Sequence, residues 1–276
     1  MGAMVKTGAK TGKRQSMTHH IALSPEDIQR FGEDPEESFR HNLAAVEERI
    51  AKACHLAGRA RDEVRLLPVT KTVPAHILRL AHRVGITNMG ENKIQEAADK
   101  YETLADLGID WSIIGHLQTN KIKYLVRFAS EFHALDSERV AHQMNERLEK
   151  EGRDLDVFVQ VNTSDEESKF GLAPAALLPF VETLDQYPRL KPRGLMTLAL
   201  FSHDMAKVRP CFTLLRDLRD QAVQINPGLT GLSMGMSGDF EEAIEEGATI
   251  VRVGQAIFGK RPTPDSLYWP GFAGKS

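Results

Sequence analysis

Short apolar runs alternate with longer helical stretches from about residue 36 onward, and this alternation constrains the fold more than any other feature of the sequence. Eight runs of five to seven residues have the length and composition of buried strands, and they span 66–70, 86–90, 111–115, 132–136, 156–162, 193–198, 231–236 and 249–254. Strict alternation of strand and helix predicts a parallel sheet with crossover helices. Eight such units within about 200 residues are typical of a (β/α)8 barrel, a TIM barrel. A doubly wound open sheet is the alternative, but the number of units and the lack of a dinucleotide-binding glycine motif after the first run favour the closed barrel.

The remaining segments flank this barrel, which we place at residues 36–262. Residues 38–59 have Leu43, Val46, Ile50 and Ala53 at helical spacing, which predicts an amphipathic N-terminal helix. Residues 1–24 are predicted to be a disordered leader or a cloning remnant, because the first 20 residues carry four basic and no acidic side chains and have no apolar core of a secretory signal. Residues 263–276 are expected to be a C-terminal tail.

Composition excludes several classes of protein. The 276 residues are 41% hydrophobic and 26% charged, which is close to the average for globular domains. The net charge of −3, from 35 basic and 38 acidic residues, gives no electrostatic reason to expect nucleic acid or an anionic membrane as partner. No apolar run approaches the roughly 18 residues of a membrane-spanning helix. The two cysteines, Cys54 and Cys211, read as small core residues, which favours a cytoplasmic protein with free thiols.

Polar residues and glycines follow the predicted strands, where a barrel of this kind carries its chemistry. These strand ends are Lys71, Gly90–Asn92, Gly115–His116, Asp136–Ser137, Asn162, Met196–Thr197, Ser237–Gly238 and Gly254–Gln255. Lys71 is the most informative, because burial favours the neutral amine that attacks a carbonyl to form a Schiff base. The alternative for Lys71 is a lysine at the barrel rim, solvated or paired with an acid.

Two neighbouring loops are suited to phosphate. Residues 235–247 place Ser237 and Asp239 directly before a predicted helix, where either can act as N-cap, and residues 253–259 provide Gly254 and Gly259. Arg252 lies within the last strand on the face opposite Val251 and Val253, so it points into the barrel and requires a partner, either a ligand or a structural acid. The ten histidines and two cysteines show no metal-ligand spacing, so no metal is expected.

Seven segments in this order resemble the pyridoxal-phosphate homeostasis protein family (YggS/PROSC): LLPVTKT, MGENKIQEA, WSIIGHLQTNK, VFVQVNTSDEESKFG, RGLMTL, LSMGMSGDFEEAI and TIVRVGQAIFG. The resemblance covers roughly residues 36–262. It implies a single barrel like the N-terminal domain of alanine racemase, the fold type III of enzymes that use pyridoxal 5'-phosphate (PLP), with PLP as cofactor.

The resemblance also assigns roles to residues of this chain. Lys71 would hold PLP as a Schiff base, Ser237, Gly254 and Gln255 would hold the phosphate, and Arg252 would approach the pyridine nitrogen. Asn92, His116 and Met236 match positions near the cofactor. Two departures stand out: the family often has threonine at the position of Gln255, and often a second lysine at the position of Val73.

The family implies that this protein carries or buffers PLP in vitamin B6 homeostasis, without an established catalytic activity, and apo forms of PLP-dependent enzymes are the expected partners. The single domain favours a monomer. The 18 residues after Phe258 are too few for the second domain with which racemases of this fold supply an opposing acid or base. The alternatives are a PLP-dependent amino-acid racemase or lyase, and a cofactor-free barrel enzyme acting on a phosphorylated metabolite. The arginine beside the ring nitrogen does not decide the matter, because the racemases share it.

Overall fold

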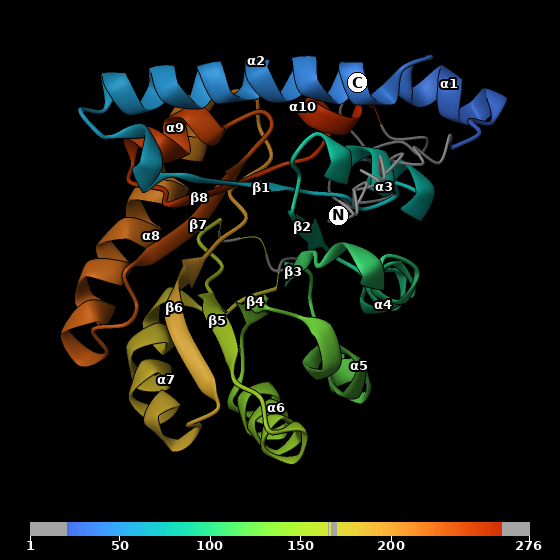
Figure 1. The fold of residues 1–276 in the computed structure, drawn as a ribbon. Coiled ribbons are helices and arrows are strands. Elements are labelled where there is room, and N and C mark those ends of the chain that lie inside the picture. The colour runs from blue at the N-terminus through green and yellow to red at the C-terminus, as the bar shows by residue number, and fades with distance from the viewer. Residues whose placement is uncertain (1–20, 165, 167–169, 261–276) are drawn as a thin grey trace, which may run out of the picture.

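The computed structural model describes residues 21–260 except 165 and 167–169, and over this range the chain forms an eight-stranded parallel β/α barrel (Figure 1). The strands are β1 Arg65–Pro68, β2 Asn88–Glu91, β3 Asp110–Ile113, β4 Glu131–Leu135, β5 Leu155–Gln160, β6 Leu190–Met196, β7 Gly231–Met236 and β8 Ile250–Val253. Every predicted strand overlaps one of them.

The barrel closes around β1, which contacts β8 on one side and β2 on the other. β1 pairs with β8 along its whole length, with Leu67 opposite Arg252. On its other side β1 meets β2 through the parallel bridge between Val69 and Gly90, and the Thr70 N–H donates to the Gly90 carbonyl at 2.9 Å. The (β/α)8 prediction is therefore confirmed, and the open-sheet alternative is wrong.

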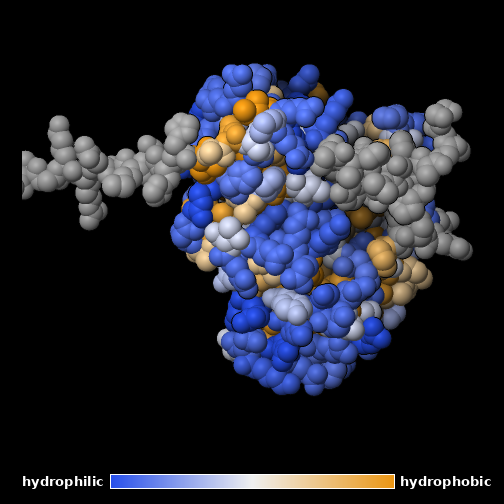
Figure 2. All heavy atoms as spheres, turned by 90° about the vertical axis from the view of Figure 1, so that its right-hand side faces the viewer, coloured by the Kyte–Doolittle hydropathy of each residue, from blue (hydrophilic) through white to orange (hydrophobic). Residues whose placement is uncertain are grey.

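The helices form the outer layer of the barrel. They are α1 Pro25–Phe31, α2 Pro35–Leu56, α3 Ala75–Arg83, α4 Ile94–Thr103, α5 Ile122–Phe128, α6 Glu138–Glu151, α7 Leu177–Thr183, α8 Met205–Ile225, α9 Phe240–Glu245 and α10 Gln255–Phe258. Apolar side chains of strands and helices share one buried core, whereas the outer face that includes α3, α4 and α5 is largely hydrophilic (Figure 2). None of the helices described is long and apolar enough to cross a membrane.

The long helix α2 confirms the amphipathic helix expected from the sequence. Val46, Ile50 and Ala53 are buried, while Leu43 lies at the margin of the core and is only partly buried. α2 packs against α3, α9 and α10 and crosses the barrel beside β1 and β8 (Figure 1). Because α10 after β8 has only four residues, α2 covers the part of the barrel wall that α10 is too short to cover.

Helix α1 was not expected from the sequence. Ser24 caps it in a capping box with Asp27, and Pro25 occupies its first turn. The predicted leader of residues 1–24 therefore includes the cap of this helix, while residues 1–20 and most of the predicted tail, 261–276, lie outside the described residues. Cys54 and Cys211 are buried free thiols, in α2 and α8.

Candidate functional site at the carboxyl ends of the strands

Lys71 lies in a tight turn directly after β1. The Val73 N–H donates to the Thr70 carbonyl at 3.0 Å, so Lys71 and Thr72 are the two central residues of a β-turn. Thr72 has φ +66°, as the third residue of a type II turn requires, although that position is normally glycine or asparagine. Lys71 is half-buried at the mouth of the barrel.

A buried lysine on α4 holds the turn from one side. Lys100 Nζ donates to the Thr70 carbonyl at 2.9 Å, and to Oε1 of both Glu91 and Glu96 at 2.7 Å, so all three ammonium protons are used. Glu96 Oε1 also accepts the Thr72 N–H at 2.7 Å. The residues on both sides of Lys71 are thus tied to the same helix, which limits the directions in which the lysine can point.

Glu91, at the end of β2, is fully buried beneath this turn. Burial raises the pKa of its carboxyl, against the opposing influence of Lys100. Thr70 Oγ1 donates to Glu91 Oε1 at 2.6 Å, while Glu91 Oε2 has no hydrogen-bond partner within the described part of the chain. The turn therefore rests on a buried Lys100–Glu91 ion pair that only tertiary packing creates.

Arg252 of β8 points into the barrel, as the alternation of its neighbours predicted. Its Nη1 donates to Ser233 Oγ and its Nη2 to the Thr197 carbonyl, both at 2.8 Å. Burial lowers the pKa of the guanidinium to about 10, so it remains charged at neutral pH. No carboxylate among the described residues lies within ion-pair distance of it, and the structural acid considered for Arg252 is therefore not found there.

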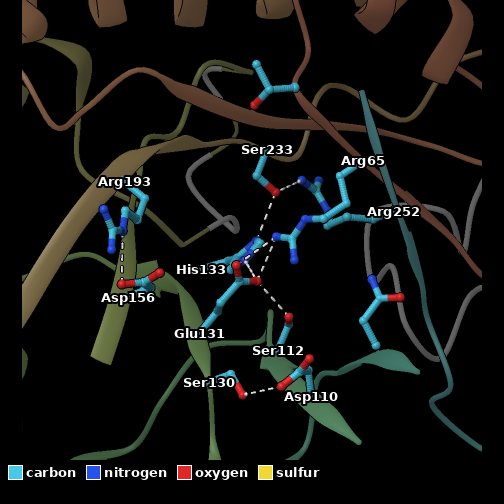
Figure 3. A network of polar contacts seen from close by, with 12 residues as sticks. Arg65, Asp110, Ser112, Ser130, Glu131, His133, Asp156, Arg193, Ser233 and Arg252 are labelled. Atoms are coloured by element: carbon cyan, nitrogen blue, oxygen red, sulfur yellow. Dashed lines mark hydrogen bonds and ion pairs between the residues drawn. The ribbon is translucent and has the colours of Figure 1, made fainter. Parts of the chain in front are cut away.

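A chain of polar contacts continues from Arg252 toward the opposite end of the barrel (Figure 3). Ser233 Oγ lies 3.0 Å from His133 Nδ1, and His133 Nε2 lies 3.0 Å from Glu131 Oε2. Glu131, the first residue of β4, also accepts two hydrogen bonds of 2.8 Å from Arg65 and one of 2.8 Å from Ser112.

Electrostatics keep the two ends of this chain charged and its middle neutral. Burial lowers the pKa of His133, which favours the neutral imidazole. Burial alone would raise the pKa of Glu131, but His133 and Arg65 outweigh it and lower that pKa to about 2. The interior therefore holds Arg252 in place through neutral groups, with the Glu131 carboxylate at the far end of the chain. The carboxylate that acts on the guanidinium itself, over a longer distance, is Asp239.

The ends of β7 and β8 lie side by side, since Met236 pairs with Arg252. The predicted phosphate loops, which contain Ser237 and Gly254, are thus neighbours. Of the two expected caps of α9, Asp239 occupies the N-cap position, but its Oδ1 accepts the Met236 N–H at 2.5 Å instead of a helix N–H. Ser237 is not a cap and lies in the turn between β7 and α9.

The loops after β2 and β3 also touch each other. A Cβ on Gly115 would lie 2.1 Å from the Asn92 carbonyl oxygen, so only glycine permits this approach. Asn92 Oδ1 is buried without a hydrogen-bond partner among the residues described. His116 stacks on Phe170 with 3.7 Å between ring centroids, and its Nδ1 lies 3.4 Å from Asp136.

The eight residues that the resemblance assigns to the cofactor occupy one continuous arc of the barrel rim, from β7 through β8, β1 and β2 to β3. In that order they are Met236, Ser237, Arg252, Gly254, Gln255, Lys71, Asn92 and His116. The residues that support them were not predicted from the sequence. A helical i, i+4 spacing could have indicated the Glu96–Lys100 pair, but no local signal connects His133 with Ser233 or Arg252. Over residues 21–164, 166 and 170–260 no group of three histidine, cysteine or acidic residues could hold a metal.

The fold and this rim define the class of protein. The sequence profile of the alanine racemase N-terminal domain matches residues 39–262. Alanine racemase from Clostridium difficile has the same fold, with a TM-score of 0.65 at 13% identity over 83% of this chain and 57% of that one.

Sequence relatives define the family more narrowly. The pyridoxal phosphate homeostasis protein of Aquifex aeolicus is 44% identical over 220 residues, which cover 79% of this chain and 96% of that protein. The Escherichia coli protein of the same name is 37% identical over 80% of this chain and 96% of its own length. PipY of Synechococcus elongatus, in a structure with PLP bound, has a TM-score of 0.68 and 33% identity over 78% of this chain and all of PipY. The chain belongs to the pyridoxal phosphate homeostasis protein family.

Proposed function

We propose that this protein binds PLP at the arc of the barrel rim that runs from β7 through β8, β1 and β2 to β3. We propose that it carries or buffers PLP in vitamin B6 homeostasis, without catalysing a reaction. The observation that carries the proposal is the pairing of two features on adjacent strands. The residues before and after Lys71 are both hydrogen-bonded to α4, and Arg252 is a buried cation with no carboxylate at ion-pair distance among the described residues. The solved relative that holds PLP supports the same cofactor here.

The residues present fit this cofactor. The aldehyde of PLP reacts with amines, and its ring acts as an electron sink for the adduct that forms. Lys71 would bind the aldehyde carbon, and Arg252 would donate a hydrogen bond to an unprotonated ring nitrogen, which suits a guanidinium with no carboxylate at ion-pair distance among the described residues. The buried Asn92 Oδ1, which lacks a partner among the described residues, would accept a hydrogen bond at the ring.

The phosphate would lie at the adjoining ends of β7 and β8. Ser237 would donate its hydroxyl, Gly254 its backbone N–H, and Gln255 its amide in place of the threonine common in the family. A side chain at Gly238 would meet only open space, so the turn leaves room beside Ser237. Met236 and His116 would border the ring.

A carrier role is supported by the relatives, which are named as homeostasis proteins and which this chain matches over 96% of their length. Arg252 would disfavour protonation of the ring nitrogen and weaken the ring as an electron sink, but racemases of this fold share such an arginine, so the carrier role rests on the relatives. We further propose that the protein acts as a monomer, that it delivers PLP to apo-enzymes, and that it resides in the cytoplasm, where the free thiols of Cys54 and Cys211 remain reduced.

Absorbance spectra of the purified protein with added PLP test this proposal. We expect a new band that is lost in Lys71→Ala and kept in Lys207→Ala, whose lysine is exposed on α8. Borohydride reduction followed by peptide mapping should then place a pyridoxyl group on Lys71. Absence of the band would refute the binding site and leave a barrel without an assigned cofactor. A steady loss of optical activity from an added amino acid would instead establish a racemase.

A further inference from the structure

Helix α1 lies outside the family match of residues 39–262, yet it contacts the turn that carries Lys71. Arg30, in the last turn of α1, donates from Nη1 to the Thr72 carbonyl at 2.6 Å. Its Nη2 donates to Thr72 Oγ1 at 3.0 Å. A segment that precedes the shared barrel thus reaches the residue next to the proposed cofactor-binding lysine.

The backbone conformation of Thr72 is unfavourable and needs contacts from neighbouring elements to hold it. Thr72 is the one non-glycine with positive φ in the described chain, and β-branched side chains rarely adopt that conformation unless their surroundings impose it. Arg30 binds both its carbonyl and its hydroxyl, while Glu96 accepts its N–H at 2.7 Å from the α4 side. The turn is therefore held between α1 and α4, and only the α1 half is particular to the region before the family match.

Arg30 is itself held in position by the anchoring of α1. Asp27 lies 2.9 Å from His76 Nε2, which ties α1 to α3 (Figure 1). Phe31 packs edge-to-face on Phe39 of α2 with 6.1 Å between ring centroids. The arginine donates from a helix fixed to two neighbouring helices, so its contact with Thr72 is directional.

We propose that Arg30 is a positioning residue: through Thr72 it fixes the direction of Lys71, and α1 thereby sets the affinity and the release rate of PLP. This rests on the proposed function, since Lys71 must bind PLP for the clamp to have a ligand. The clamp consists of Arg30, Thr72 and Glu96. It makes part of the site depend on a helix that precedes the region matched by the family.

Hydrogen–deuterium exchange on the cofactor-free protein tests the clamp without reference to PLP. In Arg30→Ala, amides of the peptide that spans residues 70–73 should exchange roughly tenfold faster, because the turn loses one of its two supports. Arg40→Ala is the matched control: Arg40 is an exposed arginine on α2 that pairs only with Glu37 among the interactions identified, and its loss should leave the turn unchanged. Equal exchange in Arg30→Ala and wild type would overturn the proposal.

PLP titration and release then test positioning. For Arg30→Ala we expect a roughly tenfold higher Kd, equivalent to about 1.4 kcal/mol, faster release, and an altered visible circular dichroism of the bound cofactor. Arg30→Lys should restore part of each effect, and Arg40→Ala should match wild type. Faster exchange with unchanged PLP affinity and dichroism would overturn the positioning role. Should Arg30→Ala fail to fold, Arg30→Gln is judged by the same criteria.

The two proposals fail in different ways. A wild-type chain that takes up no PLP refutes the proposed function, and with it the positioning role, whatever the exchange data show. A wild-type chain that binds PLP, together with an Arg30→Ala variant that binds and releases it identically, refutes the positioning role alone.

Discussion

Glu131→Gln should destabilise the protein at neutral pH, because Glu131 is the carboxylate that balances the polar chain through the barrel interior. His133 and Arg65 overcome the cost of burial and lower the pKa of Glu131 from 4.5 to about 2. A depression of that size corresponds to about 3 kcal/mol at 1.36 kcal/mol per pH unit. Arg65 is partly exposed, so solvent screens its share, and the neutral His133 imidazole contributes its hydrogen bond but no charge at pH 7, so we expect a loss of about 2 kcal/mol.

The pH dependence of this loss has a definite sign. The folded-state pKa of Glu131 lies below its unfolded value, so the stabilisation is complete above pH 4.5 and disappears as the pH falls toward 2. The difference between wild type and Glu131→Gln should be constant from pH 7 to pH 5 and smaller by about 1 kcal/mol at pH 3.5.

Urea unfolding followed by far-ultraviolet circular dichroism at pH 7, 5 and 3.5 measures these differences. Glu37→Gln is the control, because Glu37 is an exposed carboxylate paired with Arg40, and its loss should cost less than about 0.5 kcal/mol. A cost below about 0.5 kcal/mol for Glu131→Gln at pH 7, or one that does not shrink between pH 5 and pH 3.5, would refute the electrostatic reasoning.

Two further substitutions test the packing of the site by urea unfolding. Lys100→Met should cost about 3–5 kcal/mol at pH 7, because it leaves the buried Glu91 carboxylate without its counter-ion. Since Glu91 can then take a proton, the penalty should diminish on acidification, and a pH-independent penalty would contradict this account. Gly115→Ala should cost about 1–3 kcal/mol or more through the clash with the Asn92 carbonyl oxygen, whereas Gly58→Ala meets no neighbouring atom, so any loss there reflects only its positive φ. Equal stability of Gly115→Ala and wild type would show that the two loops do not touch.

Much of the fold follows from local patterns in the sequence. The eight apolar runs became strands because strands of a parallel sheet are buried on both faces and read as short continuous apolar runs. α2 formed where Val46, Ile50 and Ala53 recur at helical spacing. Helix α1 was missed because its signal is a seven-residue segment with a cap, too short for a hydrophobic period to be recognised.

Part of the candidate site also follows from the sequence. Lys71, Ser237, Arg252 and Gly254 were found because the carboxyl ends of barrel strands share one rim, so position along the chain was enough to collect them. Their assignment to parts of a cofactor came from resemblance, and the assignment remains a prediction.

Only the tertiary structure decided what surrounds these residues. Arg30 meets Thr72 across 42 positions of sequence, and His133 meets Ser233 across 100. A side chain's periodicity reports which face of its own element it occupies, but its partner is set by how the elements pack and by the barrel's closure between β1 and β2. The sequence alone therefore determined the elements and the rim on which chemistry is carried. Packing decided which buried charges form pairs, such as Lys100 with Glu91, and how firmly the turn that carries Lys71 is held. Both depend on distances between segments that no local pattern encodes.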